Sequence, residues 1–297
     1  MLSDRDHRKI RGRTERLLHD ADADGRWPTR VDDLVAAADL TEPEESPLDS
    51  SVLARAPRYL RKAVELINSG KIRAILDRRE RTVHLDPSIS NDGRRSFLRL
   101  HEVSHDILEW QRDPAFADDD GTLSPQTDRR FEREANQGAA ELLFQGDRFA
   151  ALTREYRIGM AAVSELSAIV GSSLRATLRR YAESHDGAVC AIAVEPSPRS
   201  RAPLRYKRWE VSQSEAWGER FGSTWPPHLS VDCFPFLNTL TGEELGSETL
   251  WPFPDLNLEM VEVRAEAVAT PYAGLLLLWV PRRETFKRRR RLEVAAT

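Results

Sequence analysis

Residues 94 to 110 read RRSFLRLHEVSHDILEW and contain the pattern H-E-x-x-H, with His101, Glu102 and His105 at its three defined positions. Residues four apart lie on one face of an α-helix, so both imidazoles can reach one metal ion. Zinc accepts such ligands in a tetrahedral arrangement that keeps one position open for water. Glu102 lies beside that face, where it can take a proton from zinc-bound water. Two interpretations are open: a zinc-hydrolase active site, or a chance order of two histidines and a glutamate.

The sequence around the motif favours the metal site over a solvated helix with two surface histidines. Its apolar side chains provide a buried environment for a helix that ends near Trp110: Phe97, Leu98, Leu100, Ile107 and Leu108. Two strand-like runs, residues 72–78 and 81–87, precede the helix and predict a hairpin. A helix that follows such a hairpin is a suitable place for a metal site.

A hydrolytic zinc site also requires a third protein ligand. The metzincin pattern would place a third histidine at position 111, but the residue there is Gln111. The segment FEREAN, residues 131–136, offers Glu132 instead, on a second predicted helix. Asn136 is one turn from Glu132 on the same face, so we expect it to hydrogen-bond the second nitrogen of a ligand histidine. Glu134 is expected to point in roughly the opposite direction.

HEVSH followed by EREANQGAAELL resembles the ImmA/IrrE family of metallopeptidases, over roughly residues 5 to 183. The resemblance implies an α+β, gluzincin-like fold, with a small, partly mixed sheet on the active-site helix and the third-ligand helix crossing beneath. It assigns His101, His105 and Glu132 to Zn2+ and Glu102 to the role of general base. One departure is visible: family members often have a proline after the leucines, and Phe144-Gln145-Gly146 stands there. That change concerns the helix end rather than the metal.

The resemblance also implies a substrate. Members of the family are typically intracellular proteases that cleave helix-turn-helix transcriptional repressors and so induce stress-response or mobile-element genes. The IrrE branch also carries a helix-turn-helix-like segment and a GAF-like C-terminal domain. We therefore expect a zinc endopeptidase with a protein substrate. The alternative is a DNA-binding or ligand-sensing regulator that uses an inactive peptidase fold as a scaffold.

The pattern of apolar residues divides the chain into three parts. Helices are expected at residues 5–20, 31–40 and 53–68, and in a further helix with Thr127 or Asp128 as its N-cap. Together with the motif helix they form a metallopeptidase domain, residues 1–150, and a helix-turn-helix-like segment follows in 151–186. Beyond Gly187 four runs predict strands of a β-rich, GAF-like domain in 187–297: GAVCAIAVEP, LRYKRWEVS, EMVEVRAEAVAT and YAGLLLLWVP.

Two features raise the question of DNA binding. Residues 160–183 predict a helix, a glycine turn and a second helix, whose polar residues could touch phosphates or base edges: Ser173, Arg175, Arg179 and Arg180. We favour a helical pair that completes the peptidase core. The basic run at 287–291, in the tail FKRRRRLE, is more typical of a solvated terminus. DNA contact is therefore not favoured.

Hydrolases of this kind often stabilise the transition-state oxyanion with a tyrosine or histidine. Tyr156, Tyr181 and His84 are candidates, and the sequence does not choose among them.

The composition places further limits on the class of protein. Hydrophobic residues make up 40% of the 297 residues and charged residues 31%, as in soluble globular proteins. The N-terminal residues do not resemble a secretory signal, and the longest apolar run, AGLLLLWV at 273–280, is too short to span a bilayer. Cys190 and Cys233 have no neighbouring cysteine, which favours free thiols. We expect a cytoplasmic protein without a membrane partner.

Overall fold

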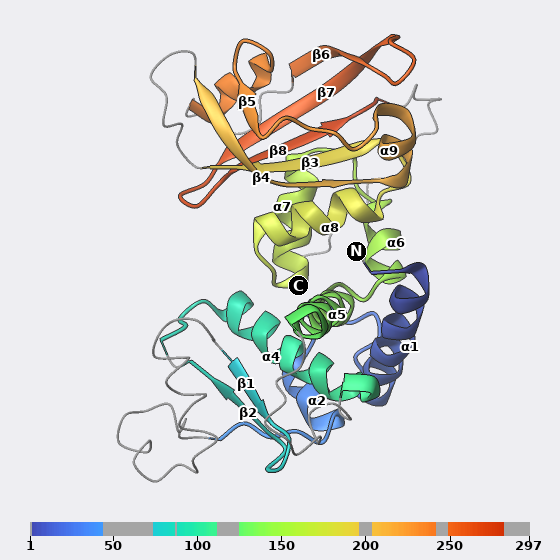
Figure 1. Cartoon of the computed structure of the whole chain (residues 1–297), viewed down its shortest axis with the longest axis vertical. Coiled ribbons are helices and arrows are strands. Elements are labelled where there is room, and N and C mark those ends of the chain that lie inside the picture. The colour runs from blue at the N-terminus through green and yellow to red at the C-terminus, as the bar shows by residue number, and fades with distance from the viewer. Residues whose placement is uncertain are drawn as a thin grey trace, which may run out of the picture. The chain divides into compact units, whose positions relative to one another are not determined.

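A computed structural model of the 297-residue chain describes residues 2–43, 74–86, 88–111, 125–195, 204–241 and 249–281 (Figure 1). These residues form two compact units. The first unit comprises the chain up to Arg157 together with Ala161–Arg180, and the second comprises Ile158–Met160 and the chain from Tyr181 onward. Both units combine helices with antiparallel strands, which confirms the expected α+β class. The helix predicted at 53–68 and the basic run at 287–291 lie outside the described residues.

The first unit opens with two amphipathic helices. Helix α1, Asp4–Asp20, begins at a capping box in which the Ser3 hydroxyl accepts from the Asp6 amide and the Asp6 carboxylate accepts from the Ser3 amide. Its buried side chains are three or four residues apart: Ile10, Thr14, Leu17 and Leu18. Helix α2, Val31–Ala37, buries Val31, Leu34 and Val35. Both helices lie where the apolar periodicity predicts them.

A hairpin lies next to helix α4, Asp92–Ile107 (Figure 1). Strands β1, Ala74–Asp77, and β2, Thr82–Leu85, pair antiparallel, which confirms the predicted hairpin. Arg81, in the turn, donates to the buried Asp106 carboxylate of α4 over 2.6 and 3.1 Å. This ion pair ties the hairpin to the helix. An isolated parallel bridge between Thr41 and Thr82 adds one parallel contact to this small sheet.

Helix α5, Pro125–Phe144, packs against α4. The contact is close at Gly138, because a Cβ atom added there would lie 2.7 Å from the Ser104 hydroxyl oxygen of α4. The predicted N-cap at Thr127 or Asp128 is wrong, since the helix already begins at Pro125. Proline suits the first helical turn, where its missing amide hydrogen needs no partner.

The end of α5 is anchored by a glutamine side chain. Gln145 and Gly146 both have positive φ angles, 50° and 51°, which turn the chain sharply into helix α6, Asp147–Thr153. The buried Gln145 amide bonds four groups of the loop between α1 and α2: it donates to Ala23 O, Arg26 O and Thr29 Oγ1 and accepts from the Gly25 amide. Gln145, which belongs to the segment Phe144-Gln145-Gly146, therefore holds this loop against the end of α5.

Helices α7, Met160–Val170, and α8, Leu174–Ser184, follow with a turn at Gly171 between them, as the sequence predicts. The two compact units divide inside α8, between Arg180 and Tyr181. The change from helices to strands comes shortly afterwards, at β3, whose first residue is Val189. The residues of the helical pair are thus divided between the two units.

The second unit is built on a six-stranded antiparallel sheet in the order β5-β4-β3-β8-β7-β6 (Figure 1). Four strands lie where the sequence predicts them: β3, Val189–Val194, β4, Arg205–Gln213, β7, Met260–Ala269, and β8, Gly274–Trp279. Four elements described in this unit were not predicted: helix α9, Glu215–Phe221, the 3-10 helix η4, Pro235–Thr241, and the edge strands β5, His228–Ser230, and β6, Thr249–Pro254. They are short or contain proline, so their sequences carry little periodic signal.

The core of the second unit is rich in aromatic rings. The largest rings come from α9 and the segments that follow it: Trp217, Phe221, Trp225, Phe234, Phe236, Trp251 and Phe253. Strand β8 is buried along its whole length, as expected for the run AGLLLLWV. Across the ranges that the structure describes, no helix has the length and apolar character needed to cross a membrane.

Candidate metal centre

Helix α4 presents two imidazoles side by side. Its N-cap residue Asn91 accepts a hydrogen bond from the Arg94 amide at 2.8 Å, and its inner face buries Leu100, Val103 and Ser104. This packing fixes the rotation of the helix, so that His101 and His105 point to the same side. Their Nε2 atoms lie 3.1 Å apart, and their side chains are only 12% and 16% exposed.

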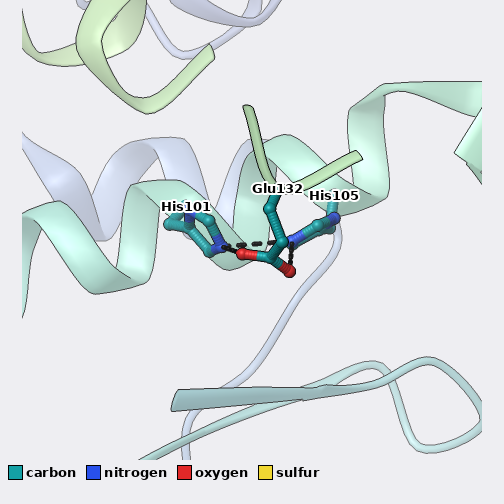
Figure 2. A group of neighbouring side chains, drawn as sticks. All are labelled: His101, His105 and Glu132. Atoms are coloured by element: carbon teal, nitrogen blue, oxygen red, sulfur yellow. Dashed lines mark hydrogen bonds and ion pairs between the residues drawn. The ribbon is translucent and has the colours of Figure 1, made fainter. Parts of the chain in front are cut away.

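Helix α5 brings a carboxylate to these imidazoles (Figure 2). Glu132 Oε2 lies 3.3 Å from His101 Nε2, and Glu132 Oε1 lies 3.5 Å from His105 Nε2. Figure 2 shows the carboxylate lying between the two rings. One ligand atom from each of the three residues falls within 4.8 Å of the others.

The spacing of these atoms fits a zinc ion. Ligands about 2.1 Å from a tetrahedrally coordinated zinc lie about 3.4 Å from one another. The contacts among the three side chains, 3.1, 3.3 and 3.5 Å, bracket that value. Two imidazole nitrogens and a carboxylate oxygen are also donors that zinc accepts, with a fourth position left for water or substrate. The residues therefore fit the expected metal.

The pKa values of Glu132 and His105 are shifted in opposite directions. Hydrogen bonds from His101 and His105 hold the pKa of Glu132 well below the ordinary value. Burial lowers the pKa of His105, but the hydrogen bond with Glu132 and the charge of Glu102 outweigh it, so that the net shift is upward. Both shifts favour an ion pair between a negatively charged Glu132 and a positively charged His105.

Glu102 lies beside the cluster but is not part of it. Its side chain is buried, and its carboxylate accepts a hydrogen bond from the main-chain amide of Leu76 in β1. Burial raises the pKa of Glu102, although the nearby charges of His105 and His101 oppose that shift. A carboxylate with a raised pKa is well suited to accept a proton and return it.

The hydrogen-bond partner of His105 is the side chain of Gln111. His105 Nδ1 lies 2.7 Å from Gln111 Oε1, whereas Asn136 is exposed on α5. Gln111 in turn donates to Glu134, which is buried. Sequence reasoning missed both residues, because the contact depends on how the short turn after α4, Glu109–Gln111, packs on α5. The sequence offered one signal for Gln111: it occupies the position at which a metzincin has its third histidine.

The candidates for oxyanion stabilisation lie in three different settings. His84 is buried on β2, and burial lowers its pKa. Tyr156 is half-buried after α6, near Glu155 and Glu165. Tyr181 is buried in the second unit beside the His185 ring. Within the described ranges of the first unit, neither His84 nor Tyr156 has a hydrogen bond or ion pair with His101, His105 or Glu132.

The polar side chains of α8 are largely engaged in the fold. Arg180 donates to Glu141 of α5 at 2.9 Å, and the two side chains are only 12% and 5% exposed. The Ser173 hydroxyl accepts from the Ala176 amide and caps the helix. These contacts agree with a helical pair that supports the first unit, and they leave fewer basic groups for nucleic acid.

No protein-family model matches this chain, and no curated protein matches it. Among solved structures, a Mycobacterium tuberculosis transcriptional regulator is similar, with a TM-score of 0.51 and 10% sequence identity. The similarity covers 93% of this chain and 77% of the regulator. At this level of identity the two proteins share a fold.

Proposed function

We propose that this protein is a zinc-dependent endopeptidase of the ImmA/IrrE type. The observation that carries the proposal is the convergence of His101, His105 and Glu132 at the spacing of zinc ligands, with the buried Glu102 next to them. The first unit is then a gluzincin-like peptidase domain and the second a GAF-like domain. The resemblance of HEVSH and EREANQGAAELL to the two motifs of the family supports this assignment.

The proposed reaction divides the work between the metal and the chain. Bound zinc would lower the pKa of a water molecule and polarise the peptide carbonyl. His101, His105 and Glu132 would hold the ion, and the 59% exposure of the Glu132 side chain leaves the group accessible to solvent. Glu102 accepts a proton from the attacking water and gives it to the leaving amine. Its raised pKa makes the second transfer easier than it would be for an exposed glutamate.

The proposed substrate is a helix-turn-helix transcriptional repressor, whose cleavage would induce stress-response or mobile-element genes. This part of the proposal follows from the family resemblance. The best protein to test is a small helix-turn-helix protein encoded next to this chain's gene.

The test combines metal content with cleavage. Wild-type protein should contain one equivalent of zinc and cut the neighbouring repressor. Glu102→Gln should keep its zinc and lose cleavage, whereas His101→Ala should lose both. Glu109→Gln is a matched control, because Glu109 is an exposed glutamate that pairs with Arg13 rather than with the cluster. Zinc-free wild-type protein, or normal cleavage by Glu102→Gln, contradicts the proposal.

A second candidate is a DNA-binding or ligand-sensing regulator that uses the fold only as a scaffold. The similarity to a mycobacterial transcriptional regulator favours it. The burial of Arg180 in an ion pair with Glu141 weighs against DNA binding through α8. A gel-shift assay at physiological salt separates the two candidates: specific binding that survives removal of zinc supports the regulator, and its absence supports the peptidase.

A further inference from the structure

A chain of hydrogen bonds leads away from the candidate metal centre at His105. Neutral histidine carries one proton, on either Nδ1 or Nε2, and only the unprotonated nitrogen can bind a metal. In His105 the nitrogen that faces Glu132 and His101 is Nε2, and the nitrogen that faces away from them is Nδ1. The proton must therefore be on Nδ1 for His105 to act as a ligand.

The partner of Nδ1 is the side-chain amide of Gln111, at 2.7 Å. An amide can present either its oxygen, which accepts, or its NH2 group, which donates. If the oxygen faces His105, Nδ1 keeps its proton and Nε2 has a free lone pair. If the NH2 group faces His105, the proton moves to Nε2 and metal binding is opposed. The orientation of Gln111 thus decides whether the ring can bind a metal.

Glu134 fixes that orientation. Its carboxylate can only accept hydrogen bonds, and it receives three: from Gln111 Nε2 at 2.9 Å, Trp110 Nε1 at 2.8 Å and Arg130 Nε at 2.8 Å. The indole and guanidinium groups cannot act as acceptors. Turning the Gln111 amide over would place its oxygen against the carboxylate of Glu134, and both side chains are buried, so bulk solvent would not screen the repulsion.

The backbone around Gln111 is held as well. Arg78, in the turn that follows β1, donates to Gln111 O at 2.8 Å and to His105 O at 3.2 Å. Arg130 donates a second bond to Asp6 of α1 at 3.0 Å, so the carboxylate of Glu134 is fixed from the other side. Gln111 and Glu134 are 2% and 1% exposed, which excludes solvent from the chain of bonds.

We propose that Gln111 and Glu134 form a positioning relay that keeps the proton of His105 on Nδ1 and presents the Nε2 lone pair to zinc. The inference rests on the proposed metal centre and adds two residues that act through His105 without touching the metal. Loss of such outer partners commonly weakens metal binding by about ten- to a hundredfold. His101 has no corresponding side-chain bond at Nδ1 within the described ranges, so the relay acts on one ligand.

The first experiment measures zinc affinity by competition with a chromophoric chelator. Glu134→Gln should weaken zinc binding at least tenfold, because the new amide can donate to Gln111 Oε1 and so turn the NH2 group of Gln111 towards His105. Glu141→Gln is the matched control: Glu141 is also buried on α5 and also pairs with an arginine, Arg180, but has no contact with Gln111. Its zinc affinity should change less than twofold.

A charge-conserving exchange separates positioning from stability. In the double variant Gln111→Glu, Glu134→Gln, the new carboxylate at 111 accepts the His105 Nδ1 proton, and the new amide at 134 donates to it. Zinc affinity should return to within about threefold of wild type, since a carboxylate partner also holds this tautomer. Equal losses in Glu134→Gln and Glu141→Gln, or no recovery in the exchange variant, would overturn the inference.

A tautomer measurement makes the inference independent of zinc binding and of the folding of the Glu134 variant. Glu132 competes for a proton at Nε2 in the metal-free protein, so the measurement uses Glu132→Ala at alkaline pH with 15N-labelled histidine. Two-bond proton–nitrogen correlations should show His105 as the Nδ1–H form. The Nε2–H form overturns the relay. Wild-type protein that binds no zinc, with His105 still in the Nδ1–H form, refutes the proposed function and leaves the relay standing.

Discussion

The substitution Gly138→Ala tests whether the close contact between α4 and α5 sets the geometry of the metal centre. Gly138 lies six residues beyond Glu132 on α5 and contacts Ser104, which lies between the two histidines on α4. An added Cβ atom would lie 2.7 Å from Ser104 Oγ and 2.9 Å from Ser104 Cβ. Ser104 cannot easily turn away, because it is fully buried and donates to Leu100 O at 2.7 Å.

The size of the effect follows from these distances. Carbon atoms in ordinary contact are about 3.5–4.0 Å apart, so the 2.9 Å contact requires the helices to separate by roughly 0.6–1 Å. Overpacking of this kind costs about 1–3 kcal/mol, and alanine recovers about 1 kcal/mol of helix propensity. We expect a net loss of about 1 kcal/mol in the free energy of unfolding. Zinc ligands tolerate only about 0.2 Å of displacement, so zinc affinity should fall at least tenfold.

Two measurements test this expectation: urea unfolding of the metal-free protein and competitive zinc titration. Gly12→Ala is the control, because Gly12 lies in helix α1 with nothing within 4 Å of an added Cβ. That variant should gain roughly 1 kcal/mol and keep its zinc affinity. Adding Ser104→Gly to Gly138→Ala should restore zinc affinity. Unchanged zinc binding in Gly138→Ala would show that the helix contact does not set the ligand spacing.

Three further predictions concern charge and buried polar groups. Burial raises the pKa of Glu102, so the charged carboxylate destabilises the fold at pH values above the ordinary pKa of glutamate. Glu102→Gln removes that charge and should raise the unfolding free energy of the metal-free protein at neutral pH by on the order of 1 kcal/mol. A loss of stability in urea unfolding would contradict this. The pKa of His105 is raised above 6.5, so zinc affinity should increase with pH through the range just above that value, because zinc displaces a proton. Over the same pH range the metal-free protein should lose the stability that protonated His105 contributes below pH 6.5. Zinc affinities from calorimetric titration that do not change with pH would refute the first statement, and melting temperatures that do not change with pH would refute the second. Gln145→Ala should lower the unfolding free energy by roughly 2–4 kcal/mol, because it leaves several buried loop groups without partners, and a loss below about 0.5 kcal/mol in urea would contradict the anchoring role.

Local patterns in the sequence were enough to predict much of the first unit. The apolar spacing of α1, the alternation in β1 and β2, and the two helical motifs each depend on residues within a few positions of one another. The convergence of Glu132 with the histidines was also predictable, because helix geometry determines which face each residue occupies.

The contacts that were not predicted depend on how distant segments pack. Asn136 and Gln111 are both amides, and sequence spacing favoured Asn136, but the turn after α4 brings Gln111 to His105. Glu134 was expected to point in roughly the opposite direction from Glu132, yet it is buried and accepts hydrogen bonds from Trp110 and Gln111. Helical periodicity alone could not show that a charged residue on this face has three hydrogen-bond donors around it.

The hydrogen bond between the Leu76 amide and Glu102 has a consequence for how this protein can change in evolution. The donor is a main-chain group, so every residue except proline at position 76 preserves it. Substitutions in β1 can therefore accumulate without releasing the carboxylate. An insertion or deletion in the strand is different, because alternate amides of a strand point in opposite directions and a shift of one residue would turn the donor away. The length of this hairpin should thus be far less tolerant of change than its composition.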